Sequence, residues 1–217
     1  YNNGVLDGVY TTYNERGQTR VACMFLNGCL EGRFKILNDT TEKEHRDLLV
    51  CYYKNDKRHG RYMYNYWGDI ILCNYDDGVL NGEYNVWKTV RDNVKINTLS
   101  CFFKNGVLDG LLKKSDRQGH WKVEAHFKYG VYHGEYSEFI RDQRVYKVNY
   151  VNGKKHGKFT TWYESNKIKS AGTFKNDKKD GRYKEWLENS RMIVSYTYSN
   201  GVLSGRCKEW DRNGNLL

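Results

Sequence analysis

The sequence predicts an all-β fold, a single elongated, twisted antiparallel sheet (a meander or solenoid) of about nine tandem β-hairpin repeats over residues 1–217. Three observations indicate this class. The string Asn-Gly-x-x-x-Gly-x-aromatic recurs along the chain, most glycines occupy fixed places in it, and aromatic residues stand at fixed offsets from it. Such a period is typical of stacked supersecondary units, each of which buries its apolar surface against its neighbours.

The turn residues define each repeat. The string reads LNGCLEGRF from residue 26, DDGVLNGEY from 76 and VNGKKHGKF from 151. Asn, Asp and Gly tolerate positive φ, so the string predicts a linking turn, and further glycines eight or nine residues later predict a tip turn. Each repeat is therefore expected to be strand, tip turn, strand, linking turn. The second glycines, expected to be structural, are Gly8, Gly32, Gly60, Gly82, Gly110, Gly134, Gly157, Gly181 and Gly205.

Aromatic residues recur at three fixed offsets from the string, and each set is called a column. The −3 column stands three residues before the place of the first glycine, and the +2 and +5 columns stand two and five residues after the second glycine. Because side chains alternate between the faces of a strand, the +2 and +5 columns are expected on opposite faces, with a ring ladder on each. The −3 column is Tyr1, Phe25, Tyr53, Tyr75, Phe103, Phe127, Tyr150, Phe174 and Tyr198. The +2 column is Tyr10, Phe34, Tyr62, Tyr84, Tyr136, Phe159 and Tyr183. The +5 column is Tyr13, Trp87, Phe139, Trp162, Trp186 and Trp210.

Positive charge is concentrated at the linking turns of repeats seven and eight. The chain has a net charge of +10, which favours acidic partners and equally fits a solvated lysine-rich surface. Adjacent repeats would bring six basic residues together as an edge for an anionic partner, although Asp177 and Asp180 lie among them. Repeat three has similar residues in Lys57, Arg58 and Arg61. The six are Lys154, Lys155, Lys158, Lys178, Lys179 and Arg182.

The repeat accounts for residues that could otherwise suggest chemistry. Cys23, Cys51, Cys73 and Cys101 share one column, and equivalent positions two strands apart lie about 9.6 Å from each other, beyond the reach of a disulfide. We therefore expect buried thiols in a reducing, intracellular compartment, and no signal peptide or transmembrane segment is visible. His59, His133 and His156 share a polar turn position. No catalytic, cofactor or metal motif is present, so the sequence predicts no enzyme.

The repeats resemble the MORN repeat, and more closely its variant in YwqK-type antitoxin-like proteins of bacteria. The best match runs from Gly157 to Gly181, GKFTTWYESNKIKSAGTFKNDKKDG, with its Gly-x-aromatic start and closing aromatic-x-Asn turn. The resemblance implies an antiparallel sheet of hairpins and a scaffolding role, with lipid binding in some members. It also implies a family common in bacteria, protists and large DNA viruses.

Two features depart from the regular repeat. Repeats two and four are longer, with additions at Asp39–Asp47 and Thr89–Asn97 that fall at tip turns and are expected to protrude, either as interaction loops or as tolerated insertions. The last repeat, ending EWDRNGNLL, is too short for a full second strand. Its apolar end, Leu216 and Leu217, is a candidate for self-association through pairing with another chain.

Three functions remain open from the sequence. The first is a non-enzymatic scaffold for protein–protein interaction or structural assembly. The second is a binder of an anionic membrane surface, a nucleic acid or another polyanion through the lysine-rich edge. The third, implied by the family resemblance, is an antitoxin-like neutraliser.

Overall fold

The computed structural model describes residues 1–37, 47–91 and 94–217 of the chain. The chain divides by its internal contacts into two units, Tyr1–Val107 (unit 1) and Leu108–Leu217 (unit 2). Both units consist of antiparallel strands joined by turns, and the described residues contain no α-helix. The predicted all-β class and hairpin meander are thus confirmed.

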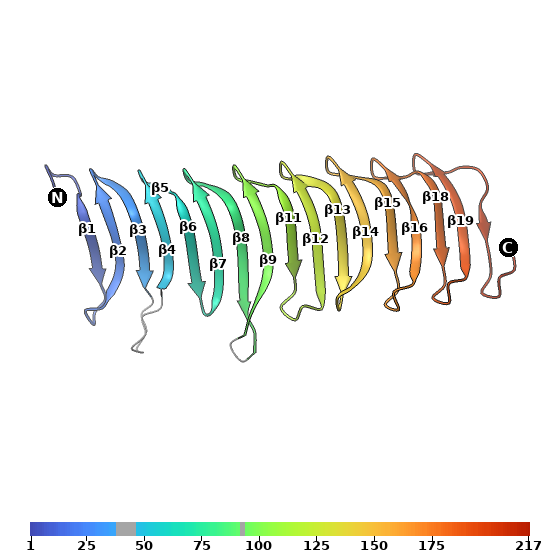
Figure 1. Cartoon of the computed structure of the whole chain (residues 1–217), viewed down its shortest axis with the longest axis horizontal. Helices are drawn as coiled ribbons and strands as arrows, with labels where there is room; N and C mark the ends of the chain where they lie inside the picture. The colour runs from blue at the N-terminus through green and yellow to red at the C-terminus, as the bar shows by residue number, and fades with distance from the viewer. Residues whose placement is uncertain (38–46, 92–93) are drawn as a thin grey trace. The chain divides into compact units, whose positions relative to one another are not determined.

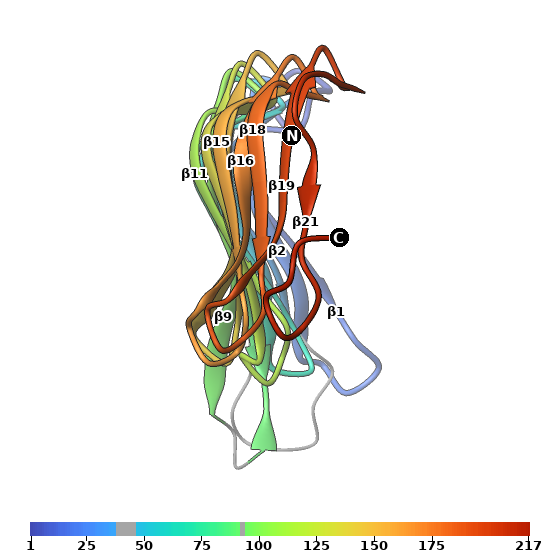
Figure 2. The same ribbon diagram turned by 90° about the vertical axis from the view of Figure 1, so that its right-hand side faces the viewer.

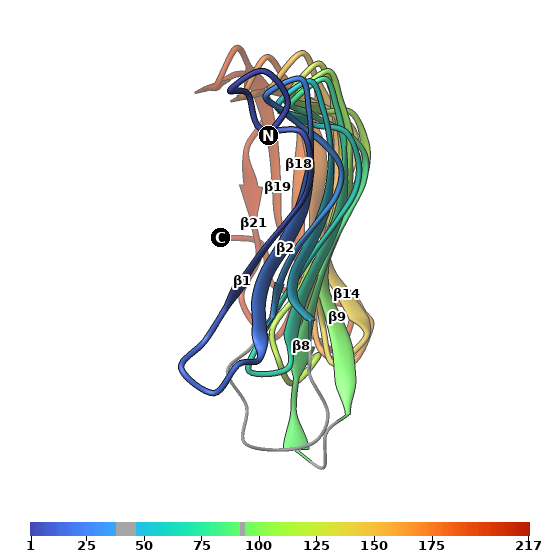
Figure 3. The same ribbon diagram turned by 90° about the vertical axis from the view of Figure 1, so that its left-hand side faces the viewer.

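Unit 1 is an antiparallel meander in which consecutive hairpins pair side by side (Figure 1). Viewed along the sheet, its strands lie in one layer, and no described segment of the unit covers either face (Figure 3). Its strands are β1 (Gly8–Tyr13), β2 (Thr19–Leu26), β3 (Cys29–Leu37), β4 (Asp47–Lys54), β5 (Lys57–Arg58), β6 (Gly60–Tyr66), β7 (Asp69–Asp76), β8 (Val79–Thr89) and β9 (Lys95–Lys104).

Unit 2 has the same arrangement, again with its strands in one layer (Figure 2). Its last hairpin is short, with a single bridge between Trp210 and Leu216, and Leu217 is 79% exposed. Strand β10 (Val107–Leu108) contains the boundary between the units. The remaining strands are β11 (Gly110–Ser115), β12 (Trp121–Lys128), β13 (Val131–Ile140), β14 (Gln143–Val151), β15 (Lys154–Trp162), β16 (Ile168–Lys175), β17 (Lys178–Lys179), β18 (Gly181–Trp186), β19 (Met192–Ser199), β20 (Val202–Leu203) and β21 (Lys208–Glu209).

The linking turns are tighter than the six-residue string suggested. In repeat two the turn is Asn27 and Gly28 alone, with φ of 49° and 86°. Positive φ at both central residues is the two-residue hairpin turn whose twist matches that of the strands it joins. The second glycine comes after this turn, at a register shift: Met24 pairs with Glu31, whereas Ala22 pairs with Lys35. The string is therefore a tight turn followed by a bulge, and the bulge needs the second glycine.

The second glycine of a repeat pairs directly with the −3 aromatic residue of the next strand. Glycine leaves a gap in the sheet surface, and a ring across the strand covers it. The second glycines and the −3 aromatic residues, which recur independently in the sequence, are therefore cross-strand partners. The pairs are Gly8–Phe25, Gly32–Tyr53, Gly60–Tyr75, Gly82–Phe103, Gly110–Phe127, Gly134–Tyr150, Gly157–Phe174 and Gly181–Tyr198.

One face of each unit, called here the ring face, carries the +2 and −3 aromatic columns. Wherever the +2 position is aromatic, these two rings touch, as in Phe34 and Tyr53 with ring centres 5.7 Å apart or Phe159 and Phe174 with ring centres 4.7 Å apart. The cysteine column lies opposite the +2 rings, so that Tyr62 pairs with Cys73. Small residues here leave room for rings on both sides, and the core is therefore thin. The buried apolar residues on this face are Cys23, Cys51, Cys73, Cys101, Val123, Ala125, Val148 and Phe159, whereas Val50 is buried on the opposite face.

The +5 column does not form the predicted second ladder. Among the described residues, its side chains make no ring–ring contact with one another. Except for Trp87, each lies next to a tip turn, and the pairing shifts register at this point in several repeats, for example between Thr161 and Trp162 and between Glu185 and Trp186. The irregular pairing interrupts the regular stacking that a ladder requires.

Candidate interaction surfaces

The linking turns of unit 2 are fixed to one another by backbone hydrogen bonds. The Gly153 N–H donates to the Tyr132 carbonyl at 2.8 Å, and the Asp177 N–H donates to the Lys155 carbonyl at 3.0 Å. The Asp177 carboxylate in turn accepts the Lys155 N–H at 2.8 Å. The positions of the basic residues at these turns are therefore set by a bonded edge of the sheet.

The structure separates the six basic residues of the predicted edge into three pairs. Lys155 and Lys179 are half-buried on the ring face; the Lys179 ammonium lies 3.8 Å from the centre of the Tyr183 ring. These two lysines cover rings, as Arg58 does in repeat three above Tyr62. Such cation–π contacts make them part of the packing. The face opposite the ring face is called here the second face. The exposed residues are Lys154 and Lys178 at the turns, and Lys158 and Arg182 on the second face.

The second face of unit 2 adds two cations that the sequence reasoning missed. Lys184 pairs with Ala171 on one side and with Ser195 on the other, and Ser195 pairs with Lys208. Lys184 and Lys208 both stand three residues after the second glycine of their repeats. This shared offset could have predicted from the sequence that they lie on the same face. We call Lys158, Arg182, Lys184 and Lys208 the basic face.

Small neutral side chains separate the cations of the basic face. Lys158 pairs with Thr173, and Arg182 pairs with Thr197. The nearby acids belong to the turns, where the Asp180 carboxylate accepts the Asn200 N–H at 3.1 Å. In the strand pairings that the structure describes, no carboxylate lies opposite any of the four cations, so the basic face has a local positive potential.

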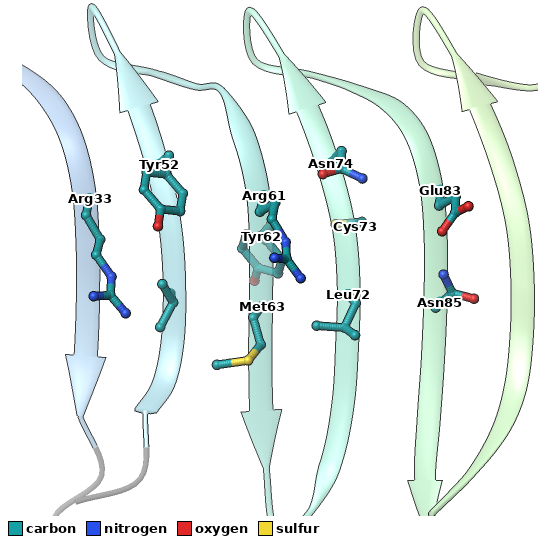
Figure 4. A pocket seen from close by; sticks show the side chains of 11 residues that line it. Arg33, Tyr52, Arg61, Tyr62, Met63, Leu72, Cys73, Asn74, Glu83 and Asn85 are labelled. Atoms are coloured by element: carbon teal, nitrogen blue, oxygen red, sulfur yellow. The ribbon is translucent and has the colours of Figure 1, made fainter.

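Unit 1 has a groove of about 440 Å³ on the face opposite its rings (Figure 4). Two rows of side chains that cross the strands line it. The first row contains Arg33 paired with Tyr52, Arg61 paired with Asn74, and Glu83 on β8. The second row contains Val50, Met63, Leu72 and Asn85, each paired with the next. The groove thus combines an apolar strip with a row that is basic at one end and acidic at the other.

His133 and the buried cysteines have structural roles. The His133 Nδ1 accepts the Asn152 N–H at 3.4 Å, which is the turn-capping place that Asp180 fills in repeat eight. Burial raises the pKa of the Cys73 thiol to about 11. All six cysteines are free thiols. Within the described ranges, no three His, Cys, Asp or Glu side chains are grouped to hold a metal ion, and no helix is long and apolar enough to cross a membrane.

The two tip insertions are described only in part. Residues 38–46, which make up most of the Asp39–Asp47 addition, lie outside the described residues, as do residues 92 and 93 of the Thr89–Asn97 addition. The described part of the second addition extends the hairpin of β8 and β9, where Thr89 pairs with Lys95 and the Val90 N–H donates to the Val94 carbonyl at 2.9 Å.

A comparison with protein-family models identifies one match. The model described as a MORN repeat variant matches residues 155–176. This segment is the hairpin of β15 and β16, and it overlaps the stretch from Gly157 to Gly181, whose sequence most resembles that repeat. No curated protein matches the chain.

Proposed function

We propose that this MORN-repeat protein is a non-enzymatic scaffold that presents the faces of its sheet to protein partners. MORN repeats generally mediate protein or membrane interactions. The observation that carries the proposal is the single layer of strands in each unit, since no described segment of that unit covers either face (Figures 2 and 3). The ring face is occupied by contacts within the chain, so the second face, where the residues vary most between repeats, is the better partner surface.

Affinity capture from the native host, followed by mass spectrometry, tests the scaffold. The whole chain is immobilised on beads, and the proteins that bind to it are compared with those that bind to an immobilised control protein of similar positive charge. Specific partners that remain bound at physiological salt support the proposal. Recovery of the same proteins on both matrices would contradict it, because charge alone would then explain the binding.

The basic face supports a second function, binding of an anionic membrane surface or another polyanion. Four cations without a paired carboxylate attract phosphates, and the threonine and serine hydroxyls between them can donate hydrogen bonds. Binding to phosphatidylserine vesicles and to single-stranded DNA is measured against salt. We expect Arg182→Glu combined with Lys184→Glu to abolish the binding, and Arg61→Glu in unit 1 to leave it unchanged. Salt-independent binding would exclude this mechanism.

An antitoxin-like role stays a prediction of the family resemblance. A toxin gene next to the gene for this chain, and rescue of growth on co-expression, would support it.

A further inference from the structure

We propose that the groove of unit 1 binds an extended segment of a partner protein that carries an acidic, an apolar and a basic side chain in that spatial order. This inference rests on the scaffold proposal and assigns the chemistry of one partner. Arg61, Met63 and Glu83 on β6 and β8 are its main determinants, and Figure 4 shows all three in the groove.

The acidic side chain of the partner would bind Arg61. This side chain is exposed and has no hydrogen bond or ion pair within the part of the chain that the structure describes. Its place in the first row is between Tyr52 on β4 and Asn74 on β7, which line the same groove. A guanidinium holds a carboxylate through two parallel hydrogen bonds, which fixes orientation as well as position.

The apolar side chain would lie on the second row. Val50, Met63 and Leu72 are consecutive across β4, β6 and β7, and Val50 is only 8% exposed. They form the floor of a groove of about 440 Å³, within the range of pockets that hold small ligands or single side chains. Because an exposed ion pair contributes little by itself, removing this apolar strip from water would supply much of the affinity.

The basic side chain would bind Glu83. This carboxylate is exposed and has no ion pair among the described residues. Arg61 and Glu83 lie on β6 and β8, two strand spacings apart, which is about 9.6 Å. A segment in the extended polyproline II conformation, with three residues per turn and a rise of about 3.1 Å per residue, covers that distance in about three residues and directs both side chains to the same side. The partner motif therefore has its basic residue about three positions from its acidic residue, with the apolar residue between them.

The charge arrangement favours a protein segment over a polyanion in this groove. A continuous polyanion would meet Arg61 and then the like charge of Glu83, and it would offer nothing to the strip of Val50, Met63 and Leu72. A peptide segment can carry an acidic, an apolar and a basic side chain together, which matches the lining of this groove.

Peptide display on the immobilised full chain tests the inference. A library of random nonapeptides is selected on the wild type, Arg61→Glu, Glu83→Lys and Arg182→Glu. Arg182 is the matched control, because it occupies the same place in repeat eight as Arg61 in repeat three. We expect the wild type and Arg182→Glu to enrich the acidic–apolar–basic motif. Arg61→Glu should exchange the acidic residue for a basic one, and Glu83→Lys should exchange the basic residue for an acidic one.

The enriched peptide, labelled with fluorescein, is then titrated in an anisotropy assay. We expect at least a tenfold higher Kd for Arg61→Glu and an unchanged Kd for Arg182→Glu, with far-UV circular dichroism confirming that each variant is folded. If Arg61→Glu does not fold, the charge exchange in Glu83→Lys decides the question. Failure to enrich any motif, enrichment of purely acidic peptides, or equal losses in Arg61→Glu and Arg182→Glu would overturn the inference.

Affinity capture distinguishes this inference from the scaffold proposal. Host partners that remain bound to the Arg61→Glu chain would uphold the scaffold and overturn the groove as their site. Enriched groove peptides without any captured host protein would overturn the scaffold and leave the peptide site standing.

Discussion

Replacement of Gly157 by alanine measures what the second glycine of a repeat contributes to stability. Gly157 has a φ of +84° and pairs with Phe174 across the strands. A Cβ added at this glycine would have no heavy atom within 4 Å. Steric overlap is therefore absent, and only the backbone conformation opposes the substitution.

The magnitude follows from that geometry. Holding an L-residue in the left-handed region costs roughly 1–2 kcal/mol. Alanine also restricts the unfolded chain, which offsets about 0.4–1 kcal/mol of this cost. We expect Gly157→Ala to lower the free energy of opening of this hairpin by about 1 kcal/mol, and Gly157→Asn to lower it less, because asparagine tolerates positive φ.

Hydrogen exchange followed by mass spectrometry is the appropriate assay, since repeat arrays need not unfold in one step. A loss of about 1 kcal/mol corresponds to roughly fivefold faster exchange in peptides covering β15 and β16. Peptides from unit 1 serve as the internal reference. Unchanged or slower exchange in Gly157→Ala, or an equal effect of alanine and asparagine, would refute the argument that positive φ explains the glycine.

Three further predictions concern the ring face and its cysteines. Gly172→Ala places a Cβ 2.8 Å from a Phe159 ring carbon, so hydrogen exchange in peptides covering β15 and β16 should show a loss of about 1–3 kcal/mol that Phe159→Leu partly restores; slower exchange in the single variant would contradict this. Because burial raises the pKa of Cys73 to about 11, the folded chain retains this proton while the unfolded thiol loses it near pH 9. Stability should therefore fall as the pH rises from 9 to 11, and Cys73→Ala should reduce that slope, because burial also raises the pKa of Cys51 and Cys101. Alkylation at pH 8 should modify the exposed Cys207 before Cys73; the reverse order would contradict the burial argument.

The second face of the sheet is where the repeats differ from one another, and both proposals depend on it. One residue after the second glycine, repeats three and eight have Arg61 and Arg182, whereas repeat four has Glu83. The ring face cannot vary as freely, because its rings fill the gaps left by glycine and bury the cysteine column. A constant face for stability and a variable face for recognition is the division of roles expected of a repeat scaffold.

Much of the fold could be predicted because its determinants are local. Asn27 and Gly28 favour a tight turn through their own backbone preferences, and the same chemistry recurs at nearly every linking turn. The repeat period and the small size of the cysteine column also follow from residues within one hairpin, so sequence spacing was sufficient to find them.

The surfaces required the tertiary structure, because the face to which a side chain points depends on pairing and bulges. Lys155 and Lys158 belong to one predicted edge, yet Lys155 packs over the Phe174 ring and Lys158 lies on the opposite face of the sheet, paired with Thr173. The groove unites Val50, Met63 and Leu72 from three strands, and no period in the sequence connects them. The sequence by itself determined the hairpins and their turns. The register between strands decided which side chains meet, because side chains alternate between the two faces and a shift of one residue in the pairing moves every later side chain of the strand to the other face.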